Sequence, residues 1–158
     1  MDWGIVLAVA GAASAVALAG AGSSKGVGIA ASASDGLISE SPEKFPALLI
    51  LSALPGTQGI YGFVAAFFVI IKLGFLGGAA VHVTVEQGLQ IFLACLPVGF
   101  NGLISGIWQG KVGAAGVQVV AKHPQEFMKA VILAALVETY AILGLLASIL
   151  LLMGIKVG

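Results

Sequence analysis

The amino-acid sequence predicts an all-α membrane protein with four transmembrane helices, arranged as two tandem hairpins that assemble into a ring. Three observations support this fold class. Of the 158 residues, 59% are hydrophobic and only 9% are charged, whereas soluble domains contain about 25% charged residues. Four stretches are long and apolar enough to span a bilayer, which requires about 20 mostly apolar residues. The two halves of the chain also resemble each other.

The first apolar stretch covers residues 3–33. It follows Asp2 rather than a basic side chain, and its apolar run of residues 4–22 is longer than the about 7–15 residues of a signal-peptide core. We therefore predict a retained transmembrane helix. The other apolar stretches cover residues 42–73, 85–122 and 124–156. We expect helices there too, because an open strand would leave backbone polar groups unsatisfied in lipid.

Proline and glycine mark the ends of the predicted helices. A proline directly follows Ser41 and again His123, where it fits the first position of a helix. Three glycines interrupt the chain between the predicted hairpins: Gly74, Gly77 and Gly78. The positions of these prolines and glycines indicate a helical hairpin on either side of this glycine-rich segment.

The chain contains an internal repeat within one membrane domain of residues 1–158, and we assign residues 1–78 and 79–158 to its two units. Residues 50–54 match residues 132–136 at an offset of 82. The same offset pairs further residues: Pro42 with Pro124, Phe45 with Phe127, Thr57 with Thr139, and Gly62 with Gly144. Because both hairpins run in the same direction, the repeat is a parallel duplication.

In the first and third helices a different offset, 86, pairs Gly20 with Gly106 and Lys25 with Lys111. We attribute the difference of four residues to a longer first connection, residues 35–41.

The first helix is rich in Gly, Ala and Ser, many of them at the small-xxx-small spacing that lets helix backbones approach closely. The third helix carries a series of glycines: Gly99, Gly102, Gly106, Gly110, Gly113 and Gly116. These residues either pack the helices of one chain together or line the tight inner wall of a ring of many subunits. We favour the ring.

The positions of the lysines predict the orientation in a cell membrane that the chain crosses several times. Most lysines lie near the 1–2 and 3–4 connections: Lys25, Lys44, Lys111, Lys122 and Lys129. Basic residues accumulate on the cytoplasmic side. We therefore expect those two connections to be cytoplasmic and both termini to be outside.

Several functional classes find no support in the sequence. The net charge is zero, so the composition does not call for a nucleic-acid partner. The lone Cys95 cannot form an intrachain disulfide. We find no Ser-His-Asp arrangement, no metal-type Cys/His cluster and no phosphate-binding loop. We expect no catalytic site in this chain.

Glu138 is the acidic residue that does not fit a simple membrane helix. It lies about 21 Å into the fourth helix at a rise of 1.5 Å per residue, inside an otherwise apolar run. A charged side chain at that depth costs about 2.5–3.5 kcal/mol on insertion scales. It must be protonated, paired or bound to a cation, and a functional ion site is the default interpretation.

Counting residues from the helix connections places other polar groups at the level of Glu138. Gln109 and Glu138 lie at nearly equal distances from His123, so an antiparallel hairpin brings them to one level. The repeat places Gly56 at the same level in the first hairpin, followed directly by Thr57 and Gln58. The sequence therefore predicts a layer made of a hydroxyl, two amides and a carboxylate.

Neighbouring residues add to this layer. Pro55 lacks an N–H group and tends to kink a helix, and Gly56 eases the distortion, so the carbonyl of Leu54 is free to turn toward a ligand. Tyr61 lies one helical turn beyond Thr57, where its hydroxyl is placed to donate to Glu138. Hard cations prefer shells of oxygen atoms, whereas a proton needs only the carboxylate. We favour a cation.

The repeat is asymmetric at this layer. The partner position of Glu138 is Gly56, and at the offset of 86 the partner of Gln109 is Ser23. Each pair of hairpins therefore carries one carboxylate. Two other interpretations remain: a ring that carries protons, and a passive channel or structural four-helix protein.

Three segments together resemble the K subunit of bacterial V-type ATPases, a double-hairpin rotor proteolipid: residues 54–62 (LPGTQGIYG), 109–112 (QGKV) and 137–144 (VETYAILG). The resemblance covers nearly the whole chain. It implies a homo-oligomeric rotor ring in lipid that works against a membrane stator subunit. Central-stalk subunits on the cytoplasmic side would couple the ring to ATP hydrolysis or synthesis elsewhere in the complex.

In sodium-translocating members of that family, Na⁺ is held by a leucine carbonyl, a threonine, two glutamines and a glutamate. The resemblance assigns these roles here to Leu54, Thr57, Gln58, Gln109 and Glu138. It also matches Tyr61 to the tyrosine that bonds the glutamate. Na⁺ is thus the expected cargo, with H⁺ as the alternative.

Overall fold

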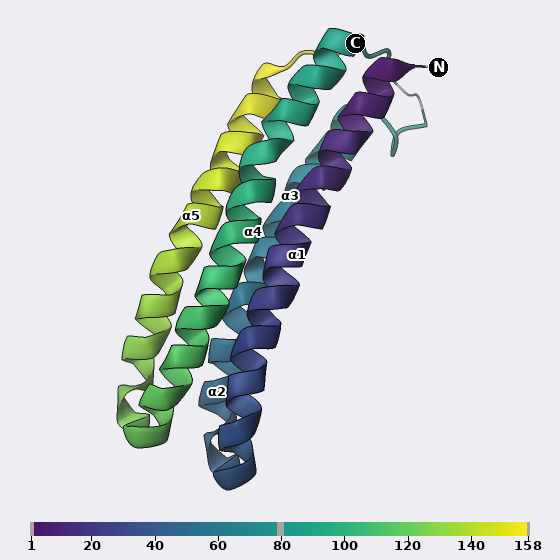
Figure 1. The fold of residues 1–158 in the computed structure, drawn as a ribbon. Helices are drawn as coiled ribbons and strands as arrows, with labels where there is room; N and C mark the ends of the chain where they lie inside the picture. The colour runs from purple at the N-terminus through teal and green to yellow at the C-terminus, as the bar shows by residue number, and fades with distance from the viewer. Residues whose placement is uncertain (1, 79–80, 158) are drawn as a thin grey trace.

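The structure is a computed structural model that describes residues 2–78 and 81–157. Within these residues two long helical hairpins lie side by side, with both ends of the chain at one end of the molecule and the two hairpin turns at the other (Figure 1). The elements in order are α1 (Trp3–Glu40), η1 (Pro42–Lys44), α2 (Phe45–Ala53), η2 (Leu54–Gly56), α3 (Thr57–Lys72), α4 (Val85–Lys122), η3 (Pro124–Glu126) and α5 (Phe127–Gly154).

In the described residues, four helical segments are long and apolar enough to cross a membrane: Trp3–Glu40, Pro42–Lys72, Val85–Lys122 and Pro124–Gly154. Large apolar side chains cover the outside of the bundle, as Ile132, Leu133 and Leu136 do on α5. Such a surface suits lipid rather than water. The prediction of a membrane protein with four transmembrane helices in two hairpins is confirmed.

Side chains fix the starts of α1 and α4. The carboxylate of Asp2 accepts hydrogen bonds from the backbone N–H groups of Gly4 and Ile5 at 3.1 and 3.3 Å. Thr84 and Gln87 form a capping box, in which each side chain accepts from the other residue's backbone N–H, at 3.2 and 2.8 Å. Both arrangements satisfy N–H groups that have no partner within the helix.

The two hairpin turns have the same geometry. Only Ser41 separates α1 from η1, and only His123 separates α4 from η3. Their backbone angles are nearly identical, φ −143° and ψ 74° at Ser41 against φ −140° and ψ 74° at His123. The prediction of a longer first connection at residues 35–41 is therefore wrong, because α1 continues as helix to Glu40.

A single offset of 82 residues relates the two hairpins throughout. The helices α1 and α4 are both 38 residues long and begin at residues 3 and 85. Contacts within the hairpins agree with this offset. A Cβ added at Gly62 would lie 2.6 Å from the Cβ of Ala19. At the equivalent position, a Cβ added at Gly144 would lie 2.7 Å from the Cβ of Asn101.

The offset of 86 that the sequence suggested for the first and third helices is therefore wrong. The repeat partner of Gln109 is Val27, not Ser23. The physical reason is the periodicity of the glycines. Small residues (Gly, Ala and Ser) recur about once per helical turn in these helices, so an alignment shifted by one turn matches small residues as well as the true one does.

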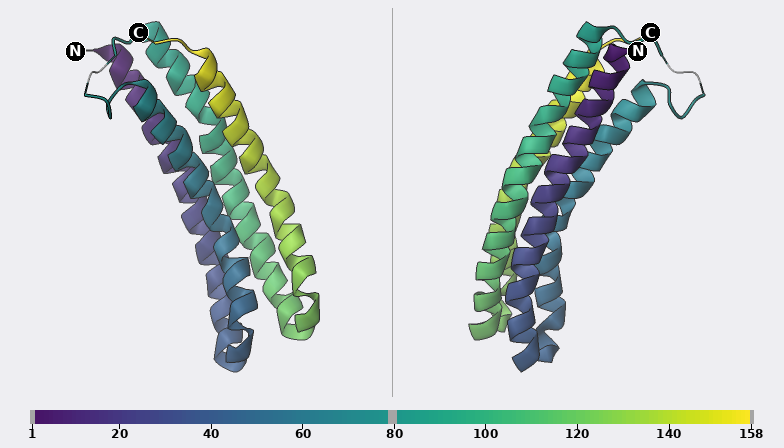
Figure 2. Two further views of the ribbon diagram at one scale, coloured as in Figure 1. Left: turned by 180° about the vertical axis from the view of Figure 1, so that it is seen from behind. Right: turned by 45° about the vertical axis from the view of Figure 1, so that its right-hand side comes forward.

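The helices α1 and α4 pack against each other at the centre of the molecule, with α2 and α3 against α1 and α5 against α4 (Figure 2). Glycine faces glycine where the central pair is closest. A Cβ added at Gly106 would lie 2.7 Å from the carbonyl carbon of Gly22, and one added at Gly110 would lie 2.6 Å from that of Gly26. The small residues thus pack two helices of one chain together, as small-xxx-small spacing allows.

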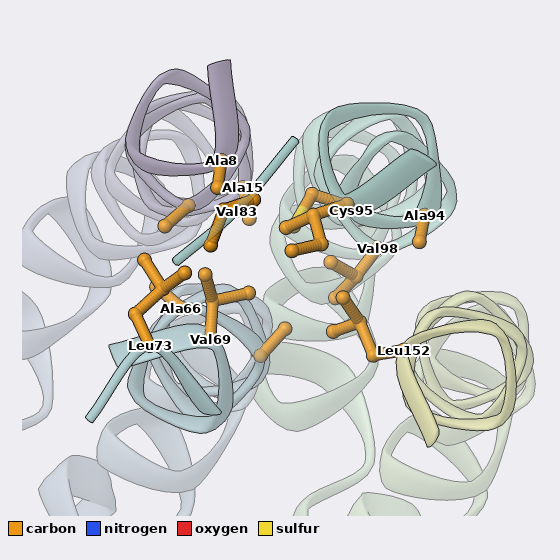
Figure 3. Packing of buried hydrophobic residues seen from close by; sticks show 13 residues of the cluster. Ala8, Ala15, Ala66, Val69, Leu73, Val83, Ala94, Cys95, Val98 and Leu152 are labelled. Carbon is orange, nitrogen blue, oxygen red and sulfur yellow. The ribbon is translucent and has the colours of Figure 1, made fainter. Parts of the chain in front are cut away.

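A cluster of small and medium-sized side chains fills the space between the helices toward the chain ends. Figure 3 shows Ala8 of α1, Val69 of α3, Cys95 of α4 and Leu152 of α5 turned toward one another. All four side chains are fully buried. This packing holds the two hairpins in one register, and so sets the relative heights of the polar groups farther along the helices.

Candidate functional site

The second spanning segment is interrupted where the sequence predicted a distortion. The 3-10 segment η2 (Leu54–Gly56) separates α2 from α3. Because Pro55 has no N–H group, the carbonyl of Leu51 loses its helical donor, and this carbonyl lies against Gly113 of α4. The carbonyl of Leu54 accepts a hydrogen bond from the hydroxyl of Thr57 at 3.0 Å.

The predicted layer of polar side chains comes together from three helices. Gln58 and Tyr61 project from α3, Gln109 from α4 and Glu138 from α5. The side chains of Gln58 and Gln109 are 0% exposed. Glu138 is only partly buried and lies at the outer edge of this group.

Hydrogen bonds connect the layer. The hydroxyl of Tyr61 donates to Oε1 of Glu138 at 2.6 Å. Nε2 of Gln109 donates to Oε2 of Glu138 at 3.4 Å and to the carbonyl of Ala134 at 3.2 Å. Nε2 of Gln58 donates to Oε1 of Gln109 at 2.5 Å. Both carboxylate oxygens therefore face neutral donors, and both amides are satisfied inside the protein.

Thr57 joins the edge of the network. Its hydroxyl lies 3.4 Å from Oε1 of Gln58, in addition to its bond to the Leu54 carbonyl. The oxygens of Leu54, Thr57 and Gln58 thus form a small group next to the two amides. Together with Gln109 and Glu138, all five residues that the resemblance assigned to the ion lie in one connected cluster.

Within residues 2–78 and 81–157, no basic side chain pairs with the carboxylate of Glu138. The ion pair recorded in this part of the chain joins Lys129 to Glu126, close to the second hairpin turn. Lys111 lies over the ring of Trp108, 4.1 Å from its centroid. Glu138 is left with hydrogen bonds from Tyr61 and Gln109, an arrangement whose remaining charge a cation or proton would balance.

The equivalent place in the first hairpin is apolar. Subtracting 82 from Glu138 and Gln109 gives Gly56 and Val27. A Cβ added at Gly56 would have a methyl group of Val27 as its nearest neighbour, at 3.9 Å. The structure thus repeats the contact of Glu138 with Gln109 but without its polar groups, and the residues that the structure describes hold one such polar cluster.

One partner of the site was not predicted from the sequence. The backbone carbonyl of Ala134 accepts from Gln109. It lies one helical turn before Glu138 and so on the same face of α5. The spacing from Glu138 is the signal that would have identified it.

The chain was compared with known proteins. The family model for the C subunit of ATP synthase matches twice, at residues 10–69 and 92–151. Both ends of the two matches are 82 residues apart, in agreement with the helix bounds.

Two relatives extend the comparison. The chain is 51% identical, over 94% of its length, to the V-type sodium ATPase subunit K of Enterococcus hirae, and covers 91% of that protein. It is 40% identical, over 98% of its length, to the A-type ATP synthase subunit K of Methanocaldococcus jannaschii, and covers 65% of that protein. The resemblance that the sequence motifs suggested is confirmed.

Proposed function

The chain belongs to the family of ATP synthase C subunits, as a multi-pass rotor proteolipid of a rotary ATPase that is not itself catalytic, and we propose that it carries Na⁺. The Na⁺ ion is its cargo, held by the carbonyl of Leu54, Thr57, Gln58, Gln109 and Glu138. The proposal also draws on the relative from Enterococcus hirae, which is named as a subunit of a sodium ATPase.

The fully buried pair of amides is the observation that carries the proposal. A proton carrier needs a carboxyl group and a way to reach it, and has no use for two glutamines. Burying an amide is costly unless its hydrogen bonds are made. Gln58 and Gln109 meet this cost by bonding each other and their neighbours. Because Gln58 bonds Gln109 rather than the carboxylate, we attribute its place in the layer to an ion that uses both amide oxygens as ligands.

In this mechanism the cation replaces the amide N–H group of Gln109 as the partner of the Glu138 carboxylate. Without an ion, Gln109 donates to Glu138 and Gln58 donates to Gln109. When Na⁺ binds, the two amides turn their oxygens toward it, next to the Thr57 hydroxyl and the Leu54 carbonyl. Tyr61 keeps its hydrogen bond to Oε1 of Glu138 and holds the carboxylate toward the ion.

Neutralising the carboxylate allows the site to move through lipid. Glu138 lies at the edge of the bundle beside exposed apolar residues of α5. A bare charge there is costly, whereas the ion-bound site is neutral. In a homo-oligomeric ring, each loaded site rotates through lipid to a membrane stator subunit, where a basic group displaces Na⁺.

Central-stalk subunits on the side of the two hairpin turns connect the ring to the ATPase. We place those turns in the cytoplasm and both termini outside.

Labelling Glu138 with a carbodiimide tests the proposal. The reagent reacts with the protonated carboxyl group, so bound Na⁺ should protect the protein. In membranes containing the intact complex at neutral pH, we expect sodium chloride to slow labelling and choline chloride to leave it unchanged. Glu138→Gln provides the background. If sodium does not protect, the chain is a proton carrier and the sodium proposal fails.

A further inference from the structure

The hydroxyl of Ser105 on α4 is buried and makes no hydrogen bond. Ser105 is 4% exposed, and its Oγ is the one buried side-chain nitrogen or oxygen atom without a hydrogen bond within residues 2–78 and 81–157. By contrast, the hydroxyls of Ser14 and Ser34 each donate to the carbonyl four residues earlier in α1. Because buried hydroxyls are nearly always hydrogen-bonded, the Ser105 hydroxyl indicates a partner that this arrangement of side chains does not supply.

The nearest polar side chain on the same helix is that of Gln109, one turn away. Residues four apart are neighbours on a helix surface, with about 5–6 Å between their Cβ atoms. Long side chains in a helix also lean toward its N-terminus, so Gln109 leans over the turn that holds Ser105. On the other side Ser105 faces Val137 of α5, the residue before Glu138. The hydroxyl therefore lies beside the ion site without bonding to it.

Both N–H groups of the Gln109 amide are in use. The Nε2 atom of a glutamine carries two hydrogens. In the structure Nε2 of Gln109 donates to the carbonyl of Ala134 at 3.2 Å and to Oε2 of Glu138 at 3.4 Å. In the proposed sodium function, on which this inference rests, the ion replaces the second of these bonds. One N–H group of a fully buried side chain then needs a new acceptor, because an unpaired buried donor would weaken sodium binding.

The other acceptors around Gln109 have roles of their own. The carbonyl of Ala134 already accepts from Gln109. The oxygens of Leu54, Thr57 and Gln58 face the ion in the proposed function. Among the described residues, the buried side-chain oxygen that is left over is Oγ of Ser105.

We propose that the hydroxyl of Ser105 accepts the N–H group that Gln109 releases when the site takes up Na⁺. Ser105 is then a positioning residue, which holds the Gln109 oxygen toward the ion and does not touch the ion itself. Protonation of Glu138 requires no such change, because an oxygen of the neutral carboxyl group still accepts from Gln109. Ser105 therefore favours Na⁺ over H⁺.

The first hairpin provides a matched comparison for Ser105. Subtracting 82 from Ser105 and Gln109 gives Ser23 and Val27. Ser23 is also buried, at 7% exposure, and packs on α3, where a Cβ added at Gly59 would lie 3.2 Å from its Oγ. One turn from Ser23 there is a valine and no amide. The two serines share their place in the repeat, but only Ser105 has an amide within its reach on the same helix.

Replacing Ser105 with alanine tests the proposal in membranes that hold the intact complex. The readout is the sodium midpoint, the sodium concentration that halves the rate of carbodiimide labelling of Glu138. It should rise about three- to tenfold in Ser105→Ala, because one net hydrogen bond of the sodium-bound site is lost. Labelling without sodium should keep the pH dependence of the parent protein. Ser105→Thr retains the hydroxyl and should keep the parent sodium midpoint, and so should the control Ser23→Ala.

A double variant separates positioning of Gln109 from a general weakening of the fold. In a Gln109→Ala background, Ser105→Ala should raise the sodium midpoint by less than about twofold, because the amide that Ser105 serves is gone. The same rise in both backgrounds would show that Ser105 acts through another group, and would overturn the proposal.

The outcomes distinguish this proposal from the proposed function. If sodium does not slow labelling in the parent protein, the sodium function fails and the role of Ser105 fails with it. If sodium protects the parent protein and Ser105→Ala keeps the parent midpoint, the sodium site stands and the role of Ser105 is wrong. An equal rise in Ser23→Ala, a rise in Ser105→Thr, or a changed pH dependence in Ser105→Ala would also contradict it.

Discussion

Replacing Gln109 with alanine removes the central group of the proposed sodium site. Its side chain is fully buried and makes three hydrogen bonds, to Glu138, Ala134 and Gln58. We expect the variant to bind sodium more weakly, because one amide oxygen of the ion's shell is lost and Gln58 loses the acceptor of its Nε2.

The magnitude follows from the kind of interaction that is lost. A hydrogen bond or ligand contact to a charged group contributes about 1.5–3 kcal/mol. Since about 1.4 kcal/mol corresponds to a tenfold change in affinity, the sodium midpoint should rise about 10- to 150-fold. Proton binding to Glu138 loses only the 3.4 Å bond from Gln109, so the pH midpoint of labelling without sodium should move less.

The assay is the rate of carbodiimide labelling of Glu138, titrated with sodium at fixed pH and with pH in the absence of sodium. Gln118→Ala is the matched control, because this glutamine is on the same helix but exposed, and it should change neither midpoint. Equal shifts of the sodium and proton midpoints in Gln109→Ala would refute direct ligation, since they would show that the amide acts on the carboxylate alone.

Three further predictions concern the same site and its support. Tyr61→Phe removes the 2.6 Å bond to Glu138 and should speed sodium release, measured as faster ²²Na⁺ exchange. The control Tyr140→Phe should leave the exchange rate unchanged. An unchanged rate in Tyr61→Phe would argue against the role of Tyr61 in holding the carboxylate. Lowering the pH from one unit to two units below the midpoint of labelling should raise the sodium midpoint about tenfold, because both ions compete for one carboxylate; a constant midpoint would exclude competition. Gly110→Leu should lower the unfolding temperature of the detergent-solubilised protein, because its side chain would enter the backbone of α1, whereas Gly154→Leu, in open space, should leave it unchanged.

The fold could be predicted largely from the length of the apolar stretches and from the prolines and glycines that mark the ends of the helices. Pro42 and Pro124 mark the starts of the second and fourth spanning segments within the residues that the structure describes. The level of Gln109 beside Glu138 followed from counting residues away from His123, because antiparallel helices advance equally on both sides of a short turn. Local geometry alone was enough for these features.

The register of the repeat in the first and third helices could not be predicted, because it depends on packing between helices. Small residues spaced one turn apart give several alignments of equal quality, and the helix bounds and the contacts of Gly62 and Gly144 with their neighbours distinguish an offset of 82 from one of 86. The carbonyl of Ala134 was missed for a related reason: every residue has a carbonyl, so the sequence carries no mark that distinguishes this one.

The apolar pair of Val27 and Gly56 has a consequence for the number of ions that the ring carries in one full turn. In the ring that we propose, a full turn carries as many ions as there are chains, half as many as there are hairpins. If the ATPase consumes a fixed amount of ATP per turn, fewer ions share that free energy. Each ion is then driven with more energy, against a steeper sodium gradient, at the expense of the number transported.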